Sequence, residues 1–76
     1  MKELIRIMAK SLVDKPDQVN VKEITGEQAM IFELRVSKDD VGKIIGKQGA
    51  TVKAMRTILS AASAKNRRRS TLEIIE

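Results

Sequence analysis

The chain has 76 residues, a formal net charge of +5, no cysteine, no histidine and one aromatic residue, Phe32. This composition excludes a disulfide framework, thiolate and imidazole metal sites, a Ser-His pair, and any nucleic-acid binding mode that needs several stacked aromatic side chains. Length and composition therefore predict one domain, residues 1–76, with no metal, no cofactor and no catalytic residue.

The positive charge is concentrated in one segment. Residues 1–37 carry six basic and six acidic side chains, whereas residues 38–69 carry nine basic and two acidic ones, a net charge of +7. Such an asymmetry attracts polyanions, of which nucleic acid is the commonest. A solvated basic face that only aids solubility has the same composition, so charge alone leaves both interpretations open.

The N-terminal segment predicts an amphipathic helix that ends before Pro16. Its charges are mixed in sign and it has no aromatic anchor, which favours packing onto a sheet over lying on a membrane. No stretch is apolar enough for a signal peptide or a membrane span, so we expect a cytoplasmic protein. The apolar positions at helical spacing are Leu4, Ile5, Met8, Ala9, Leu12 and Val13.

Two strands should follow and pair as an antiparallel hairpin. The first contains Val19 and Val21, a turn covers residues 26–28, and residues 29–36 alternate apolar and polar side chains. Phe32 has apolar residues two positions away on both sides, so we interpret it as part of the core and not as a stacking platform.

Two helices and a last strand are expected in the second half of the chain. Residues 37–40, SKDD, resemble a capping box that opens a short helix from Asp40 to Ile45. A glycine loop separates this helix from a longer one, which leads through the basic loop 65–69 into a strand over residues 71–75. The apolar stripe of the longer helix consists of Val52, Met55, Ile58, Leu59 and Ala62.

The resulting order, α-β-β-α-α-β, defines a two-layer α+β domain. Because a β-α-α-β connection crosses over right-handedly, strands 29–36 and 71–75 should be parallel neighbours. The three helices can then cover one face of a three-stranded sheet.

The loop between the two later helices carries the main functional signal. Gly46 and Gly49 bracket Lys47 and Gln48, and the missing Cβ atoms permit positive φ angles and close backbone approach. The next helix directs free N–H groups and the positive end of its dipole at the loop, which matches a sugar-phosphate strand. The simpler alternative is a helix corner where glycine only stops a helix. The glycine spacing excludes a nucleotide P-loop and a dinucleotide fingerprint.

Residues 41–53, VGKIIGKQGATVK, resemble the (V/I)IGxxGxx(I/V) signature of a KH domain. The element order resembles the prokaryotic type II arrangement, and the whole chain is similar to small bacterial single-domain KH proteins of the KhpA type. The resemblance implies that Gly46, Lys47, Gln48 and Gly49 clamp the backbone of about four nucleotides. It also implies that Ile45 and Val52 build and partly line the groove. By helical spacing, further phosphate contacts are expected from Lys43, Lys53 and Arg56.

The same resemblance implies a single-stranded RNA-binding protein with roles in RNA chaperoning and post-transcriptional control. Its expected partners are RNA and either a second copy of the chain or another KH-containing protein, and family members are linked to cell shape and cell-wall homeostasis. The loop residues Arg67, Arg68 and Arg69 fit two interpretations, a solvated loop or an RNA contact.

Three other functions compete with this interpretation. A protein-interaction module that mainly dimerises would bind nucleic acid only weakly. An enzyme would depend on carboxylates, but Asp39 and Asp40 are adjacent in sequence and better explained as helix-start residues. A helix-turn-helix for duplex DNA would need neither the hairpin nor the final strand.

Overall fold

The computed structural model describes residues 1–65 and 67–75 and contains the expected order of elements. The helices are α1 (Lys2–Leu12), α2 (Val41–Ile45) and α3 (Ala50–Ala64), and the strands are β1 (Asn20–Thr25), β2 (Ala29–Arg35) and β3 (Arg69–Ile75). Three short 3-10 turns connect them: η1 (Pro16–Gln18), η2 (Lys38–Asp40) and η3 (Lys47–Gly49).

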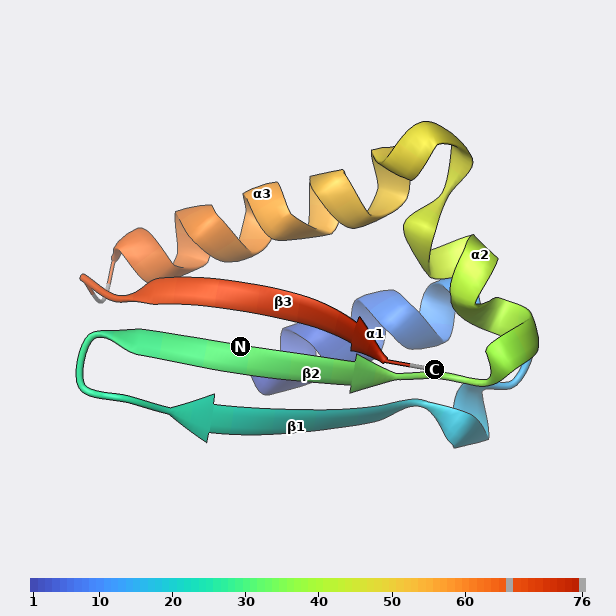
Figure 1. The fold of residues 1–76 in the computed structure, drawn as a ribbon, viewed down its shortest axis with the longest axis horizontal. Coiled ribbons are helices and arrows are strands. Elements are labelled where there is room, and N and C mark those ends of the chain that lie inside the picture. The colour runs from blue at the N-terminus through green and yellow to red at the C-terminus, as the bar shows by residue number, and fades with distance from the viewer. Residues whose placement is uncertain (66, 76) are drawn as a thin grey trace.

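The three strands form one mixed sheet in the order β1-β2-β3 (Figure 1). β1 runs antiparallel to β2 with Val21 opposite Leu34, and β2 runs parallel to β3 with Phe32 opposite Leu72. Both the predicted hairpin and the predicted parallel crossover are confirmed, and β3 is left as an edge strand.

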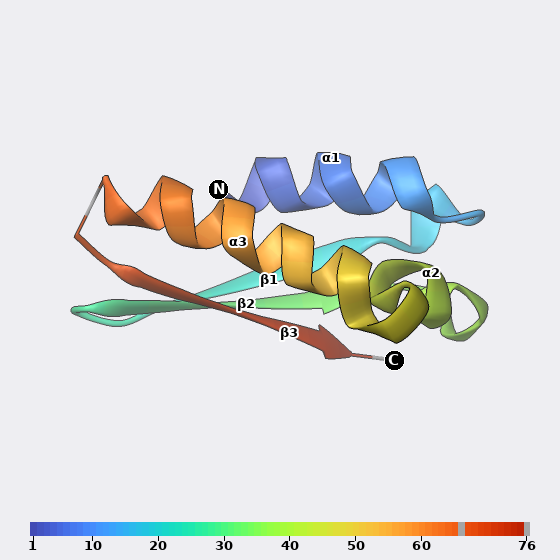
Figure 2. The same ribbon diagram turned by 90° about the horizontal axis from the view of Figure 1, so that it is seen from above.

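The helices form the second layer. α1 and α3 lie on the same side of the sheet, and α2 lies at the end of this layer where α3 begins (Figure 2). The core lies between the layers, and Phe32 at its centre is fully buried, which confirms its interpretation as a core residue. The other buried apolar residues are Ile5, Ala9, Val21, Leu34, Val36, Ile44, Val52, Met55, Leu59 and Leu72.

The backbone between α1 and β1 determines where the helix ends and where the strand begins. α1 ends at Leu12, where Val13 takes an extended backbone and Pro16 then opens a 3-10 turn. The N–H of Val19 donates to the carbonyl of Pro16 at 3.1 Å and closes that turn. β1 therefore starts at Asn20, and the prediction that Val19 belongs to the first strand is wrong.

The capping box predicted at residues 37–40 is also wrong. The side chain of Ser37 makes no capping hydrogen bond, and a 3-10 turn precedes the helix, which begins at Val41. Asp40 does not cap its own helix because its carboxylate accepts hydrogen bonds from the backbone N–H groups of Asp14 and Lys15.

Two further predictions need correction. Ile58, which was predicted in the apolar stripe of α3, is 46% exposed. The stripe that α3 buries is narrower than the predicted one and consists of Val52, Met55, Leu59 and Ser63. On an ideal helix Ile58 is rotated by about 100° from Leu59, which places it at the edge of the stripe. Arg69 does not belong to the basic loop, because it pairs with Ala29 as the first residue of β3. Asn66 of that loop lies outside the described residues.

No helix within residues 1–65 and 67–75 is both long and apolar enough to cross a membrane.

Candidate nucleic-acid interface

The glycine loop is a tight turn between α2 and α3. Gly46 and Gly49 have φ angles of 77° and 75°, which confirms that both positions use positive φ. The N–H of Gly46 donates to the carbonyl of Gly42 at 2.8 Å, and the N–H of Gly49 donates to the carbonyl of Gly46 at 3.1 Å. Gln48 also has a positive φ, 57°, a conformation that non-glycine residues adopt rarely and mostly where the surroundings enforce it.

The two glycines are needed for different reasons. A Cβ atom on Gly46 would lie 2.6 Å from the Cβ and 2.8 Å from the backbone nitrogen of Thr51, so no side chain fits there. A Cβ atom on Gly49 would meet no protein atom within 4 Å. The backbone of Gly46 is thus pressed against the first turn of α3, whereas the backbone at Gly49 is open to an approaching ligand.

The loop presents a cation beside the start of α3. Lys47 and Gln48 are exposed between the two glycines. α3 begins immediately after Gly49, and no described side chain caps its first turn. The N–H groups of Gly49 and Ala50 already donate to the carbonyls of Gly46 and Lys47, so the start of α3 attracts an anion mainly through the positive end of its helix dipole. The arrangement is suited to binding an anion.

A shallow groove lies along α3 and begins about one turn after the loop. It is open, has a volume of about 500 Å³, and is lined by Lys53, Arg56, Thr57, Ser60, Ala61 and Ala64. Arg56 donates from Nη2 to the carbonyl of Leu72 at 3.1 Å, which holds its guanidinium between α3 and the edge strand β3. The structure therefore brings together two of the predicted site residues, Lys53 and Arg56, beside the groove.

The two aliphatic site residues belong mainly to the core. Val52 is 6% exposed and Ile45 is half-buried against the core cluster. They flank the loop in sequence, and their burial fixes α2 and the first turn of α3 relative to the sheet. They can offer a ligand only the remaining exposed part of each side chain.

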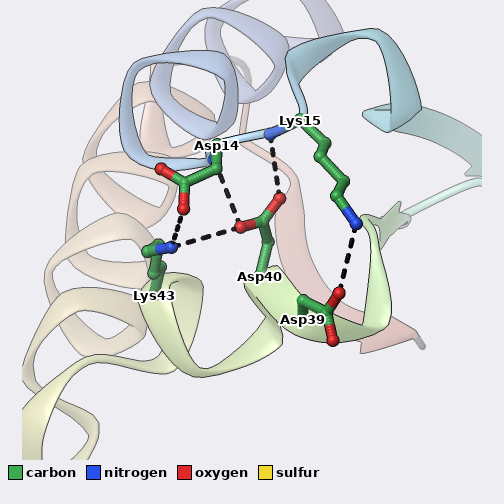
Figure 3. A network of polar contacts seen from close by, with 5 residues as sticks. All are labelled: Asp14, Lys15, Asp39, Asp40 and Lys43. Carbon is green, nitrogen blue, oxygen red and sulfur yellow. Dashed lines mark hydrogen bonds and ion pairs between the residues drawn. The ribbon is translucent and has the colours of Figure 1, made fainter.

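Lys43 occupies a different environment from Lys53 and Arg56. Its ammonium group pairs with the carboxylate of Asp14 and, at 3.5 Å, with that of Asp40 (Figure 3). The hydrogen bond with Asp14 raises the pKa of Lys43, and the two carboxylates outweigh the opposing effect of desolvation. Lys43 is thus directed toward the end of α1 and its charge is already balanced.

Sequence analysis did not foresee the role of Asp40. Its side chain is 1% exposed, and burial alone would raise its pKa. The N–H groups of Asp14 and Lys15 and the ammonium of Lys43 more than compensate, so the pKa of Asp40 lies below its ordinary value. An exposed ion pair between Lys15 and Asp39, at 3.1 Å, extends the network (Figure 3). Apart from the contact between Asp40 and Lys43, which are three positions apart, these contacts join residues more than 20 positions apart, and nothing in the local sequence pattern marks them.

A helix–GxxG–helix unit on a three-stranded α+β scaffold defines a KH domain. Residues 2–74 match the family described as "KhpA/KhpB, KH domain". The chain therefore belongs to the KhpA/KhpB family of KH domains, which is not an enzyme family.

Similar proteins cover nearly the whole chain. A protein from Clostridium perfringens named RNA-binding protein KhpA is 55% identical over 75 residues, which are 99% of this chain and 100% of the relative. Proteins of the same name from Borreliella burgdorferi and Chlamydia pneumoniae are 54% identical over 74 residues and 49% identical over 76 residues. These alignments cover 97% and 100% of this chain and 90% and 97% of the two relatives. No solved structure matches the chain significantly.

Proposed function

We propose that the chain, acting as a single KH domain over residues 1–76, binds single-stranded RNA. The observation that carries the proposal is the geometry of the glycine loop. Gly49 leaves the backbone open, Lys47 supplies an exposed charge, and the start of α3 adds the positive end of its dipole within the same few residues. Membership of a KH family, whose similar members are named RNA-binding proteins, supports the same function.

In the proposed complex, the loop from Gly46 to Gly49 clamps the sugar-phosphate backbone. Lys53 and Arg56 then contact phosphates of the strand as it enters the groove along α3. Ile45 and Val52 contribute apolar contact where they reach the surface. Of the proposed RNA-binding residues, Lys43 contributes least to the affinity. An RNA phosphate would have to compete with Asp14 and Asp40 for its ammonium group.

The absence of several aromatic side chains does not oppose this function. A KH groove reads splayed bases by hydrogen bonds and aliphatic contact, while the loop holds their backbone. Duplexes fit such a clamp less well, because their bases are paired. The proposal therefore specifies single strands over duplexes.

We further propose a homodimer, or a complex with a second KH-containing protein, in RNA chaperoning and post-transcriptional control in the cytoplasm. One groove for about four nucleotides offers few contacts, and two linked grooves raise avidity by about a hundredfold without new contacts. The second candidate, a mainly dimerising module, would need exposed apolar side chains such as Ile7 and Ile58, which are 58% and 46% exposed on α1 and α3. A link to cell shape and the cell wall rests on the family resemblance alone.

Fluorescence anisotropy with labelled RNA, single-stranded DNA and duplex RNA of one sequence tests the proposal. We expect the RNA single strand to bind tightest. With three or four phosphate contacts, a plot of the logarithm of affinity against that of salt concentration should have a slope of roughly −2 to −3. A slope near zero, or equal binding of the duplex, contradicts the proposed clamp. Dimerisation without RNA binding would support the second candidate.

A further inference from the structure

A second basic site lies at the opposite end of α3 from the glycine loop. Arg67 and Arg69 line one open hollow of about 420 Å³ together with Gln28 and Ala29. Arg68 lies between them in the chain and is exposed. We refer to Arg67, Arg68 and Arg69 as the arginine cluster. Two guanidinium groups and an amide side chain are thus available around the same hollow, and this set of donors suits a phosphate group.

Backbone hydrogen bonds hold the arginine cluster in place. The N–H of Arg67 donates to the carbonyl of Ala64 at 3.1 Å, and that of Arg68 donates to the carbonyl of Ser63 at 3.3 Å. The N–H of Arg69 donates to the carbonyl of Gln28 at 3.0 Å, which joins β3 to the turn between β1 and β2. The cluster is therefore attached to both layers of the domain.

No described carboxylate forms an ion pair with the arginine cluster. The four ion pairs within this part of the chain involve Arg6, Lys15 and Lys43. Residues 41–72 contain eight basic side chains and no acidic one. Like charges gathered around one hollow without a directly paired carboxylate repel one another in the free protein, and a bound anion relieves the repulsion.

The arginine cluster lies just beyond the end of the groove along α3. Ala64 lines the far end of that groove, and its carbonyl accepts the hydrogen bond from Arg67. The side chains between Arg56 and this end are small and uncharged: Thr57, Ser60, Ala61 and Ala64. α3 has 15 residues, so the two basic sites are separated by about 22 Å along its axis. At about 3.4 Å per phosphate, a fully stacked strand needs six or seven phosphates to cover that length, and the more extended strand with splayed bases needs fewer.

We propose that the arginine cluster is a second phosphate-binding subsite for the same RNA strand. The strand is clamped at the glycine loop, follows the groove along α3, and is held again at its far end by Arg67 and Arg69. The inference rests on the proposed function and adds a defined footprint, which exceeds the roughly four nucleotides that the loop alone can clamp.

The test measures affinity against strand length. Oligouridylates and oligoadenylates of four, six, eight and ten nucleotides are titrated into the wild type and into the R67Q/R69Q variant. For the wild type we expect the affinity to rise by about tenfold or more when the strand is lengthened from four to eight nucleotides. This gain is counted after correction for the larger number of positions at which a longer strand can bind. The variant should lose this gain and bind the tetranucleotide normally. Its salt slope for the eight-nucleotide strand should be less steep by about 1.4, or 0.7 for each lost phosphate contact.

Two further variants control for charge and geometry. K2Q/K10Q removes the same charge from exposed positions of α1 and should keep the length-dependent gain. R67K/R69K keeps the charge and should retain part of the gain, since lysine lacks the planar guanidinium fork. Circular dichroism confirms that each variant is folded, which we expect because the substituted side chains are exposed.

The possible failures are distinguishable. If affinity is constant beyond four nucleotides, or if R67Q/R69Q weakens the tetranucleotide as much as the longer strands, the second subsite is refuted while the clamp stands. If no strand binds, or if substitutions in the glycine loop leave all strands bound, the proposed function itself fails.

Discussion

The carboxylate of Asp40 accepts a hydrogen bond from the backbone N–H of Lys15 at 3.0 Å, across 25 positions of the chain. Its second oxygen accepts from the N–H of Asp14 at 3.2 Å. One buried side chain thus satisfies two backbone donors just after α1 and stands directly before α2. Because α2 ends at Ile45 and leads directly into Gly46, this contact fixes the helix that precedes the glycine loop.

Replacing Asp40 by alanine should destabilise the domain. Two backbone N–H groups would lose their acceptor in a poorly hydrated position, which is one of the costly classes of substitution. We expect the melting temperature to fall by at least about 5 °C in a chain of this size. Asp39→Ala is the matched control: it removes only an exposed ion pair with Lys15 and should leave the melting temperature nearly unchanged. Equal melting temperatures for the two variants would contradict the role of Asp40.

The network should also make stability depend on pH at both extremes. Because folding lowers the pKa of Asp40 below 3.8, its contribution is present above that pH and is lost as the pH falls through the lowered value. Because folding raises the pKa of Lys43 above 10.5, its contribution is complete below that pH and is lost as the pH rises through the raised value. Urea unfolding at a series of pH values measures both effects.

Two variants assign these pH dependences. Asp40→Asn should reduce the loss of stability below pH 3.8, and Lys43→Met should reduce the loss above pH 10.5. A wild-type profile that is flat in both regions, or variants with unchanged slopes, would show that the network does not respond to protonation as described.

Replacing Lys47 and Gln48 together by aspartate should abolish RNA binding while the fold persists. Both side chains are exposed, and aspartate tolerates the positive φ of residue 48 and the start of a helix. The loop changes from one positive to two negative charges, so we expect at least a tenfold to hundredfold loss of affinity, the loss of one charge-assisted contact alone being about 1.5–3 kcal/mol. Anisotropy measures the affinity, and circular dichroism with thermal melting measures the fold.

A double variant on α1 provides the control for total charge. Lys10→Glu with Ser11→Glu changes the net charge by the same amount at two exposed positions and should bind RNA far better than the loop variant. Normal RNA binding by the loop variant would rule out the clamp. Unfolding of the loop variant would show that the loop has a structural role only.

The two glycines of the loop should respond differently to alanine. Gly46→Ala forces a Cβ atom against the backbone of Thr51, so the free energy of unfolding should drop by more than about 2 kcal/mol. Gly49→Ala meets no protein atom, so its cost is limited to the strain of a positive φ, about 1–2 kcal/mol. Urea unfolding measures both values. In RNA titrations of folded protein, Gly49→Ala should still weaken binding, because its methyl group points into the space that the strand would occupy.

Much of the architecture could be predicted because it depends on local periodicity and on chain handedness. The apolar spacing in residues 4–13 marks the face of α1 that holds the buried residues Ile5 and Ala9, although Leu12 at its end is 38% exposed. The alternation around Phe32 marks β2. The right-handed crossover then makes β2 and β3 parallel neighbours. The glycine loop could be recognised because its residue types are needed for its own backbone conformation. In each of these cases the residues that carry the signal are close together in the chain, so a linear pattern contains it.

Features that depend on contacts between distant segments had no such signal. Asp40 looks like a helix-start residue until the fold brings it to the N–H groups of Asp14 and Lys15. Lys43 has the spacing of a groove residue, but the same contact places its charge beside two carboxylates. Ile58 has the sequence spacing of the apolar stripe, but the contact between α3 and the sheet is too narrow to bury it. The way in which the helices pack on the sheet decides which side chains pair and how wide a face of each helix is buried. That packing is specified by the whole core, not by any one segment.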